Sequence, residues 1–330
     1  MSNTLQENWR GAARARAAIR RRAMGGAGDA IFRTLTFAFA VFVLLILGGI
    51  IVSLVEGALP ALRQFGFGFF AAAAWNPVTE KFGALAPIYG TLATSGIAML
   101  IGIPVAFGVA MFITEICPIW LKRPLATMIE LLAAIPSIIY GIWGLFVFAP
   151  FVQQYIEPAI IDTLGQIPGI GALFAGPPLG IGVLTAGFIL AIMVLPFISS
   201  IMRDVFETVP PMLKESAYGL GATRTEVVLQ VVLPYTRIGV VGGIMLGLGR
   251  ALGETMAVTF VIGNAHRIST SILQPGTTIS ASLANEFTEA VGDLYLSSLV
   301  ALGLILFVIT FIVLAFAKLM LLQLQKRAGG

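Results

Sequence analysis

The sequence predicts an all-α membrane protein, a polytopic bundle of six transmembrane helices. Of its 330 residues, 58% are hydrophobic and only 11% are charged, whereas a soluble domain carries about 25% charged residues. The apolar residues gather in six stretches, each close to the roughly 20 residues that an α-helix needs to cross a bilayer. The basic residues lie between these stretches with a strong bias to one side, which is typical of membrane topology.

The first element is a polar, arginine-rich tail over residues 1–30, followed by an apolar stretch at 31–56. This stretch is too long for the apolar region of a cleaved signal peptide, so we expect a retained, accessory first transmembrane helix. Arginines flanking a first helix hold that end in the cytoplasm. The tail is therefore expected to be cytoplasmic, and 57–87 is expected to be an extracytoplasmic loop.

Five further apolar stretches predict one transmembrane domain over residues 88–318. Sixteen of the 20 lysines and arginines fall in the segments assigned to the cytoplasm, and three fall outside. This bias predicts that both termini are cytoplasmic, the C-terminus through a short tail at 319–330. The helices are expected at 88–113, 125–148, 181–201, 238–262 and 295–316, with outer loops at 149–180 and 263–294.

The longest inner loop, 202–237, has the pattern of two short helices. Pro210 and Pro211 suit the first turn of a helix, where a missing N–H costs little. Gly219 and Gly221 suit its end. Two such helices could dock into a groove of a partner protein, and the alternative is a plain connecting loop.

The second of these helices has its own start and stop signals. Thr223 is followed three residues later by Glu226, which predicts a capping box. Pro234 is then expected to break this helix before the fifth crossing.

This loop resembles the signature of binding-protein-dependent ABC importers. That signature is Glu-Ala-Ala, a glycine four residues after the second alanine, and Ile-x-Leu-Pro about ten residues later. Ser216 and Val231 depart from the commonest residues of the family. The resemblance implies a type I permease fold and a coupling helix seated in a cleft of an ATP-binding subunit. The matching residues are Glu215, Ser216, Ala217, Gly221, Leu233 and Pro234.

Two more stretches are similar to the permeases of the phosphate-specific (Pst) importers, at 130–141 and 247–258. The long outer loop after the first helix is similar to the PstC type rather than the PstA type. The resemblance, over roughly residues 30–320, implies import of inorganic phosphate across a bacterial inner membrane. It also implies a PstA-like second permease, two PstB-like ATP-binding subunits and a PstS-like extracytoplasmic phosphate-binding protein. ATP and Mg²⁺ would then be bound by the PstB-like subunits, and this chain would hold no cofactor.

Arg250 and Glu254 are the candidate residues of the substrate path. They are four residues apart, so we expect them on one face of the fifth helix. Arg250 lies thirteen residues past Arg237, about 20 Å along the axis, which predicts a position near mid-membrane. A charge there costs at least about 2.5 kcal/mol, and a guanidinium can bind two oxygens of a phosphate. The pair either lines an anion path or only neutralises itself while fastening helices.

The fifth helix also carries glycines at intervals of four, a spacing that lets two helix backbones approach closely. They are either packing positions within this chain or a sliding contact with a second permease. The residues are Gly239, Gly243 and Gly247, and Gly249 and Gly253.

Three residues outside these motifs have other expected roles. Trp75 is expected to be an anchor at the membrane interface, and His266 a surface residue rather than a ligand. The single cysteine, Cys117, excludes an internal disulfide, and the single histidine argues against a His-based metal site.

The sequence holds no P-loop and no hydrolase motif, so we expect no enzymatic activity from this chain. Three alternatives stay open. One is a permease for sulfate or molybdate. Another is an ion-coupled secondary transporter, although no internal repeat is visible. The third is a membrane phosphatase acting on a lipid phosphate, for which no convincing nucleophile is present.

Overall fold

The computed structural model describes the backbone of residues 3–328 and the side chains of residues 28–323. Over this range it is almost entirely helical, with one isolated β-bridge between Asn76 and Lys81. Six helical runs are long and apolar enough to cross a membrane, which confirms the predicted six-helix bundle. The side chains of the basic N-terminal tail before residue 28 and of the C-terminal tail after residue 323 lie outside the described residues.

The chain divides into two compact units, residues 1–56 and residues 57–330. The first unit belongs to α1 (Asn3–Phe65), whose apolar part, Gly28–Phe65, is the first candidate membrane span. The large apolar side chains between Ile31 and Leu47 are exposed, as a helix needs when lipid is its solvent. The helix continues nine residues beyond the predicted 31–56, until Gly66 adopts a left-handed φ of 55°.

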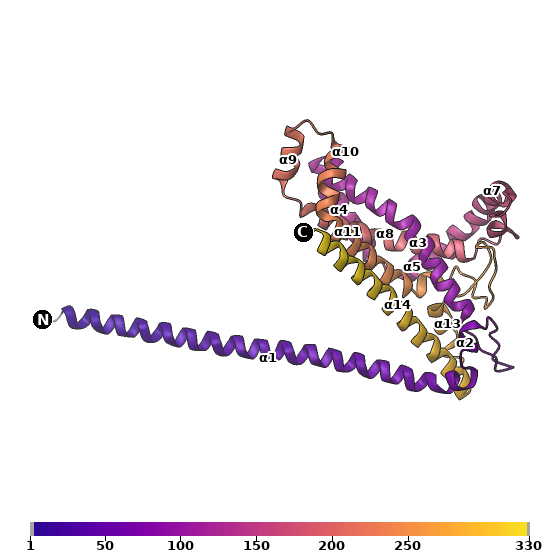
Figure 1. Ribbon diagram of the computed structural model, residues 1–330, viewed down its shortest axis with the longest axis horizontal. Helices are drawn as coiled ribbons and strands as arrows, with labels where there is room; N and C mark the ends of the chain where they lie inside the picture. The colour runs from indigo at the N-terminus through magenta and orange to yellow at the C-terminus, as the bar shows by residue number, and fades with distance from the viewer. Residues whose placement is uncertain (1–2, 329–330) are drawn as a thin grey trace. The chain divides into compact units, whose positions relative to one another are not determined.

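The second unit contains the remaining helices. In Figure 1, α4, α9, α10 and the C-terminal end of α14 lie at one end of this unit, and α2, α7 and α13 lie at the other. We call the first of these the α9 end and the second the α13 end. The α-helices are α2 (Gly68–Ala71), α3 (Leu85–Met111), α4 (Ile119–Ala133), α5 (Ser137–Trp143), α6 (Ala149–Phe151), α7 (Glu157–Thr163), α8 (Val183–Glu207), α9 (Pro211–Gly219), α10 (Arg224–Val227), α11 (Leu233–Leu252), α12 (Met256–Thr259), α13 (Ile279–Glu286) and α14 (Asp293–Ala328). The π and 3-10 helices are η1 (Phe112–Ile116), η2 (Gly144–Phe148), η3 (Val152–Ile156), η4 (Leu164–Gln166), η5 (Gly171–Phe174) and η6 (Val228–Val232).

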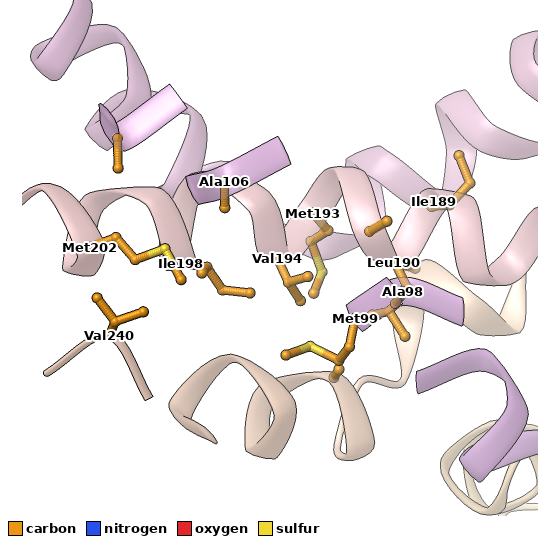
Figure 2. Packing of buried hydrophobic residues seen from close by; sticks show 14 of the residues in the cluster. Ala98, Met99, Ala106, Ile189, Leu190, Met193, Val194, Ile198, Met202 and Val240 are labelled. Carbon is orange, nitrogen blue, oxygen red and sulfur yellow. The ribbon is translucent and has the colours of Figure 1, made fainter. Parts of the chain in front are cut away.

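Helix α8 is the centre of the second unit. Its apolar side chains fill one continuous buried cluster between α3 and α11 (Figure 2). On the α3 side they meet small residues such as Ala98 and Ala106, both fully buried. Small residues bring two helices close together, and in lipid this close packing is the main force that joins them. The α8 members include Ile189, Leu190, Met193, Val194, Ile198 and Met202.

Three glycines also bring α11 close to α8. A Cβ atom at Gly239, Gly243 or Gly247 would lie 2.6, 2.9 or 2.5 Å from its nearest neighbour, which is closer than real Cβ contacts. The spacing of four therefore serves a helix contact within this chain. The neighbouring side chains all belong to α8 and are Val205, Ile201 and Ile198 respectively.

The predicted third crossing at 125–148 is wrong. Helix α4 ends at Ala133, and the crossing that follows runs over Ser137–Gln166. Pro136 separates the two, because proline disfavours the helical conformation of the residue before it. The predicted outer loop at 149–180 is therefore helical as far as Gln166, and the turn-rich part begins only there.

The predicted fifth crossing at 238–262 is also displaced. The membrane helix runs over Arg224–Leu252 as α10, η6 and α11 without interruption. Pro234 does not break it, because the wide π turn of η6 ends just before it and Pro234 stands in the first turn of α11. The remaining three crossings, Leu85–Ile116, Val183–Glu207 and Asp293–Gln323, overlap the predicted ones.

The contact between α11 and α8 gives a direct test. Gly247→Ala places a methyl group 2.5 Å from Ile198, and we expect a loss of about 1–3 kcal/mol from overpacking. Gly242→Ala, on the same helix, meets nothing within 4 Å and should be neutral or slightly stabilising. Thermal unfolding of the full chain in nanodiscs measures both, and equal melting temperatures for the two variants would contradict this packing.

Candidate functional site

The first part of the candidate site is the end of α9, which Gly221 shapes. Gly221 has a left-handed φ of 87°. Its N–H donates to the carbonyl of Tyr218, and the N–H of Ala222 donates to the carbonyl of Ala217. This pair of bonds is the Schellman motif, in which glycine is favoured because it has no Cβ. The importer signature thus has a glycine here because this residue ends helix α9 in a left-handed conformation.

The next helical turn begins with the predicted capping box. The Thr223 hydroxyl accepts a hydrogen bond from the N–H of Glu226, and the Glu226 carboxylate accepts one from the N–H of Thr223 at 2.7 Å. The capping prediction is confirmed, but the helix that it starts is not a second short helix. It is the first turn of the long run that contains Leu233 and Pro234 and reaches Leu252.

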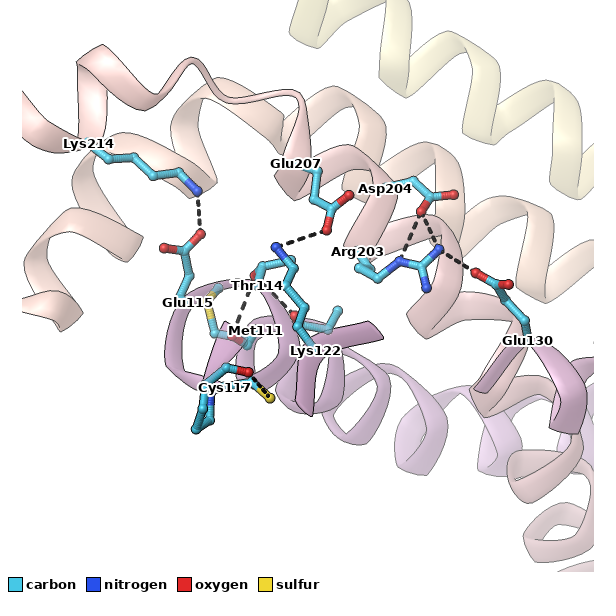
Figure 3. Close-up of polar contacts among 12 residues, drawn as sticks. Met111, Thr114, Glu115, Cys117, Lys122, Glu130, Arg203, Asp204, Glu207 and Lys214 are labelled. Atoms are coloured by element: carbon cyan, nitrogen blue, oxygen red, sulfur yellow. Dashed lines mark hydrogen bonds and ion pairs between the residues drawn. The ribbon is translucent and has the colours of Figure 1, made fainter. Parts of the chain in front are cut away.

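Helix α9 is attached to the membrane bundle by two kinds of contact. The Lys214 ammonium lies 2.5 Å from a carboxylate oxygen of Glu115, whose side chain is only 7% exposed at the end of α3 (Figure 3). Ala217 and Ala222 pack against the buried cluster around α8. An ion pair with one partner buried is costly to break, since it leaves an uncompensated charge. This ion pair joins α9 to η1, which directly continues α3.

The opposite side of α9 faces no part of the described chain. Met212 is 75% exposed and Leu220 is 91% exposed, and Leu213 and Tyr218 are also exposed. Glu215 is exposed beside them, and the exposed Ser216 donates its hydroxyl proton to the carbonyl of Met212. These exposed apolar side chains lie on several sides of α9 and at its end, and exposed apolar side chains on a short projecting helix are typical of a protein-binding surface.

Arg250, the second part of the candidate site, lies near the last turn of α11. Its guanidinium carbon lies 5.6 Å from the centre of the Phe197 ring, a cation–π contact. Phe197 is ten residues from one end of α8 and fourteen from the other, or about 15 Å and about 21 Å along the axis. Arg250 thus lies beside the middle of α8, and its side chain is exposed in this single chain.

Glu254 does not share a helix face with Arg250, so that expectation is wrong. Helix α11 ends at Leu252, and Glu254 lies in the short connection to α12. Its carboxylate accepts a hydrogen bond from the N–H of Ala257, and it makes no ion pair within the described residues. Gly141 of α5 lies close to Met256 and Ala257 of α12, the helix that follows this connection.

The last two glycines of the predicted stripe differ from the first three. A Cβ at Gly249 would make an ordinary contact of 3.6 Å with Leu314 of α14. Gly253 is the C-cap of α11 and contacts no other helix. The close contact with α8 thus ends at Gly247, and α11 itself ends soon after.

The sequence does not predict the polar cluster that lies at the α13 end. The carboxylate of Glu286 accepts hydrogen bonds from the Trp75 indole N–H at 2.5 Å and the Tyr295 hydroxyl at 2.7 Å, and His266 Nε2 lies 2.6 Å from its other oxygen. The Trp75 and His266 rings are stacked 5.0 Å apart. His266 is therefore not a free surface residue, and Trp75, which is expected to be an interface anchor, also belongs to this cluster. No group of His, Cys, Asp and Glu among the described residues is arranged to hold a metal.

The partners of Glu286 determine its charge state. Burial raises the pKa of this carboxyl group, but the hydrogen bonds from His266, Tyr295 and Trp75 and the charge of His266 outweigh that effect. The pKa of Glu286 is therefore lowered from its ordinary value, and the carboxylate is ionised at neutral pH. This carboxylate thus joins Trp75, which lies before the second crossing, to His266 and Tyr295 on either side of α13.

Comparison with known proteins places this geometry in a family. The family "Binding-protein-dependent transport system inner membrane component" matches residues 98–322. A phosphate transport system permease protein PstC of Mesorhizobium japonicum is 65% identical over 302 residues, which cover 92% of each chain. That of Haemophilus influenzae is 54% identical over 301 residues, covering 91% of this chain and 95% of the relative. A probable one of Methanocaldococcus jannaschii is 40% identical over 286 residues, covering 85% and 89%.

Solved structures share the fold. A chain of a bacterial alginate ABC transporter, solved with an alginate-bound periplasmic protein, superposes with a TM-score of 0.58 at 19% identity. It covers 87% of this chain and 93% of its own. A chain of the inward-facing MetNI methionine ABC transporter gives a TM-score of 0.55 at 16% identity, covering 72% and 94%. These similarities confirm the predicted type I importer fold.

The Glu286 cluster predicts a pH dependence. A lowered pKa means that the stabilisation is complete above the ordinary value of about 4.3 and is lost as the pH falls through the folded-state pKa. At neutral pH, Glu286→Gln should cost about 2 kcal/mol, because three donors lose a charged acceptor. Melting temperatures from neutral pH down to about 3.5 should show this difference shrinking below about 4.3. The exposed Glu289→Gln is the control, and a difference that persists at the lowest pH would refute the assignment.

Proposed function

Because this chain belongs to the family of binding-protein-dependent transport system inner membrane components, we propose that it is the membrane-spanning permease subunit of an ATP-driven importer of inorganic phosphate. Phosphate is proposed as the substrate because the chain is 54–65% identical to phosphate transport permeases over more than nine-tenths of its length. ATP hydrolysis by a partner as the energy source is supported by helix α9, which projects from the bundle, carries exposed apolar side chains and is attached to the bundle by fixed contacts. The chain itself supplies a path and no catalytic group.

The exposed side of α9 is the surface that we assign to an ATP-binding subunit. Leu220 and Met212 would insert into a groove of that subunit, and Glu215 would lie at its rim. ATP and Mg²⁺ belong to two such subunits in this proposal. A homologous second permease and an extracytoplasmic phosphate-binding protein complete the complex.

Movement of the ATP-binding subunits reaches the membrane by two routes. One is the Lys214–Glu115 ion pair, which joins α9 to α3. The other is the unbroken helix from Arg224 to Leu252, which joins the α9 end directly to Arg250. Alternating access requires a helix packing with two arrangements that both partners can bias. Both routes end on helices that pack against α8.

Arg250 is the residue that we assign to the anion. It lies at mid-depth of α8, is exposed in the single chain and has no carboxylate partner within the described residues. A guanidinium in such a place can donate paired hydrogen bonds to a phosphate. Glu254 follows Arg250 closely in the sequence, and its carboxylate accepts a hydrogen bond from the backbone of α12. Its negative charge would limit the affinity of this site for the anion.

The orientation in the membrane follows from the same proposal. The α9 end also holds the C-terminal end of α14 (Figure 1) and must face the ATP-binding subunits. We therefore assign the α9 end and both termini to the cytoplasm, and the Glu286 cluster to the extracytoplasmic side. The excess of basic residues in the assigned cytoplasmic segments agrees with this orientation.

Reconstitution tests the function as a whole. The chain is co-expressed with its candidate partner subunits, purified and placed in vesicles, and uptake of labelled phosphate is measured with and without ATP. Uptake that requires ATP and the binding protein supports the proposal. Uptake by the chain alone without ATP would support a secondary transporter instead. Equal competition by sulfate or molybdate would reassign the substrate.

Coupling is tested at Gly221. Gly221→Val should disrupt the end of α9, because a left-handed backbone costs a branched residue roughly 1–2 kcal/mol and the Schellman bonds are lost. We expect fewer co-purified ATP-binding subunits and a clear fall in uptake. Gly219→Ala is the matched control, since its Cβ meets nothing within 4 Å and its φ is helical. If Gly221→Val leaves co-purification and uptake intact, α9 is not the surface that binds the ATP-binding subunit.

The anion path is tested at Arg250. Arg250→Gln keeps a hydrogen-bond donor but removes the charge, and uptake in the assembled complex should fall at least about tenfold. Arg250→Lys should recover only part of it, because an ammonium cannot form the paired bonds. Arg237→Gln makes the same change on the same helix and should have little effect. Normal rate and affinity in Arg250→Gln would place the arginine outside the path.

A further inference from the structure

Helix α4 runs antiparallel to α8 and is interrupted at the depth of Phe197. The two ion pairs that join these helices are Lys122–Glu207 and Glu130–Arg203 (Figure 3). Phe197 is six residues from Arg203 along α8, and Pro136 is six residues from Glu130, a helical rise of about 9 Å in each case. Both paths lead away from the α9 end. The interruption at Pro136 therefore lies at the depth where Arg250 contacts Phe197.

The Tyr140 hydroxyl replaces a backbone donor that Pro136 lacks. In an unbroken helix the carbonyl of Leu132 would accept a hydrogen bond from the N–H of residue 136, and proline has no N–H. The Tyr140 hydroxyl donates to this carbonyl instead, at 2.9 Å. A phenol has one proton to donate, so this bond leaves only lone pairs on the phenol oxygen. Toward any further group, Tyr140 is therefore a hydrogen-bond acceptor.

Tyr140 belongs to the surroundings of Arg250. The positive charge of Arg250 acts on the Tyr140 hydroxyl group. The next residue, Gly141, lies close to Met256 and Ala257 of α12, just past the end of α11. The Tyr140 ring is half-buried against the cluster around α8, whereas Arg250 is exposed. An anion held by Arg250 would therefore lie beside a phenol oxygen that accepts a hydrogen bond and has no proton left to donate.

We propose that Tyr140 selects phosphate over sulfate by accepting a hydrogen bond from the protonated oxygen of hydrogen phosphate. This inference rests on the proposed function, because it assigns a second residue to the anion that Arg250 holds. At neutral pH phosphate keeps at least one P–O–H group, whereas sulfate carries no proton. A guanidinium only donates hydrogen bonds, so it binds both anions alike. The acceptor on Tyr140 would stay unpaired beside sulfate, and an unpaired polar group in a binding site rejects the ligand that leaves it so.

Equilibrium binding to the assembled complex in nanodiscs, without the phosphate-binding protein, measures this selectivity. Labelled phosphate is displaced by unlabelled phosphate, arsenate or sulfate. Arsenate also keeps a proton at neutral pH and should bind about as well as phosphate, whereas sulfate should bind at least about tenfold more weakly.

ATP-driven uptake on the same preparations, with the binding protein added, separates the two proposals. Absence of phosphate uptake would contradict the proposed function. Uptake that sulfate does not inhibit, together with equal binding of sulfate and phosphate in the nanodiscs, would contradict only the role of Tyr140. The same holds for uptake by a complex that binds no phosphate in the nanodiscs.

Tyr140→Phe removes only the phenol oxygen, so the preference for phosphate over sulfate should fall about tenfold. A merely structural role would weaken the binding of both anions and leave their ratio unchanged. Tyr155→Phe is the matched control, because it makes the same change in the same crossing at a side chain that is 64% exposed. It should leave the ratio as it is.

Two further variants keep the test decisive if Tyr140→Phe fails to fold. Pro136→Ala keeps the phenol but returns an N–H that can occupy the Leu132 carbonyl. Tyr140 can then turn its proton toward sulfate, and the preference should fall as well. Glu254→Gln removes a charge that repels both anions and should change both affinities by the same factor. A preference that survives both Tyr140→Phe and Pro136→Ala, or that is lost only in Glu254→Gln, would overturn the proposal.

Discussion

The contact between α8 and α11 is the interaction on which the rest of the structure depends. Three glycines leave no side chain between the two backbones, so Ile198, Ile201 and Val205 of α8 pack directly onto α11. Lipid is as apolar as these side chains, so dense van der Waals contact rather than escape from water holds the helices together. The same two helices place Arg250 of α11 beside Phe197 of α8, two residues before α11 ends at Leu252.

The α9 end connects a small exposed surface to two membrane helices. Helix α9 has only nine residues and contributes no fully buried side chain. Its influence comes from two links to different membrane helices, the Lys214–Glu115 pair to α3 and chain continuity through α10 to α11. Both α3 and α11 pack against α8. A partner bound to α9 would therefore be linked to the helices on both sides of α8.

The features that sequence reasoning predicted are those set by residues close together in the chain. The six crossings follow from local apolarity, and the Thr223 capping box and the Gly221 turn each depend on fewer than seven residues. The errors arose where apolarity continued across a structural boundary, as at Pro136 and beyond Leu252. The rule that placed Arg250 and Glu254 on one face assumes an unbroken helix, and α11 ends between them. The Glu286 cluster could not be predicted, because Trp75 lies 211 residues away from its acceptor.

The unbroken run from Arg224 to Arg250 has a mechanical consequence. These twenty-seven residues form a rigid helical rod about 39 Å long, which contacts α8 along one side through its glycines. If such a rod pivots by about five degrees, its far tip sweeps roughly 3 Å, which exceeds the 1–2 Å helix shifts that switch many subunit interfaces. In the proposed importer, a small rotation at the Arg224 end would therefore be enough to change the contacts of Arg250 at the other end.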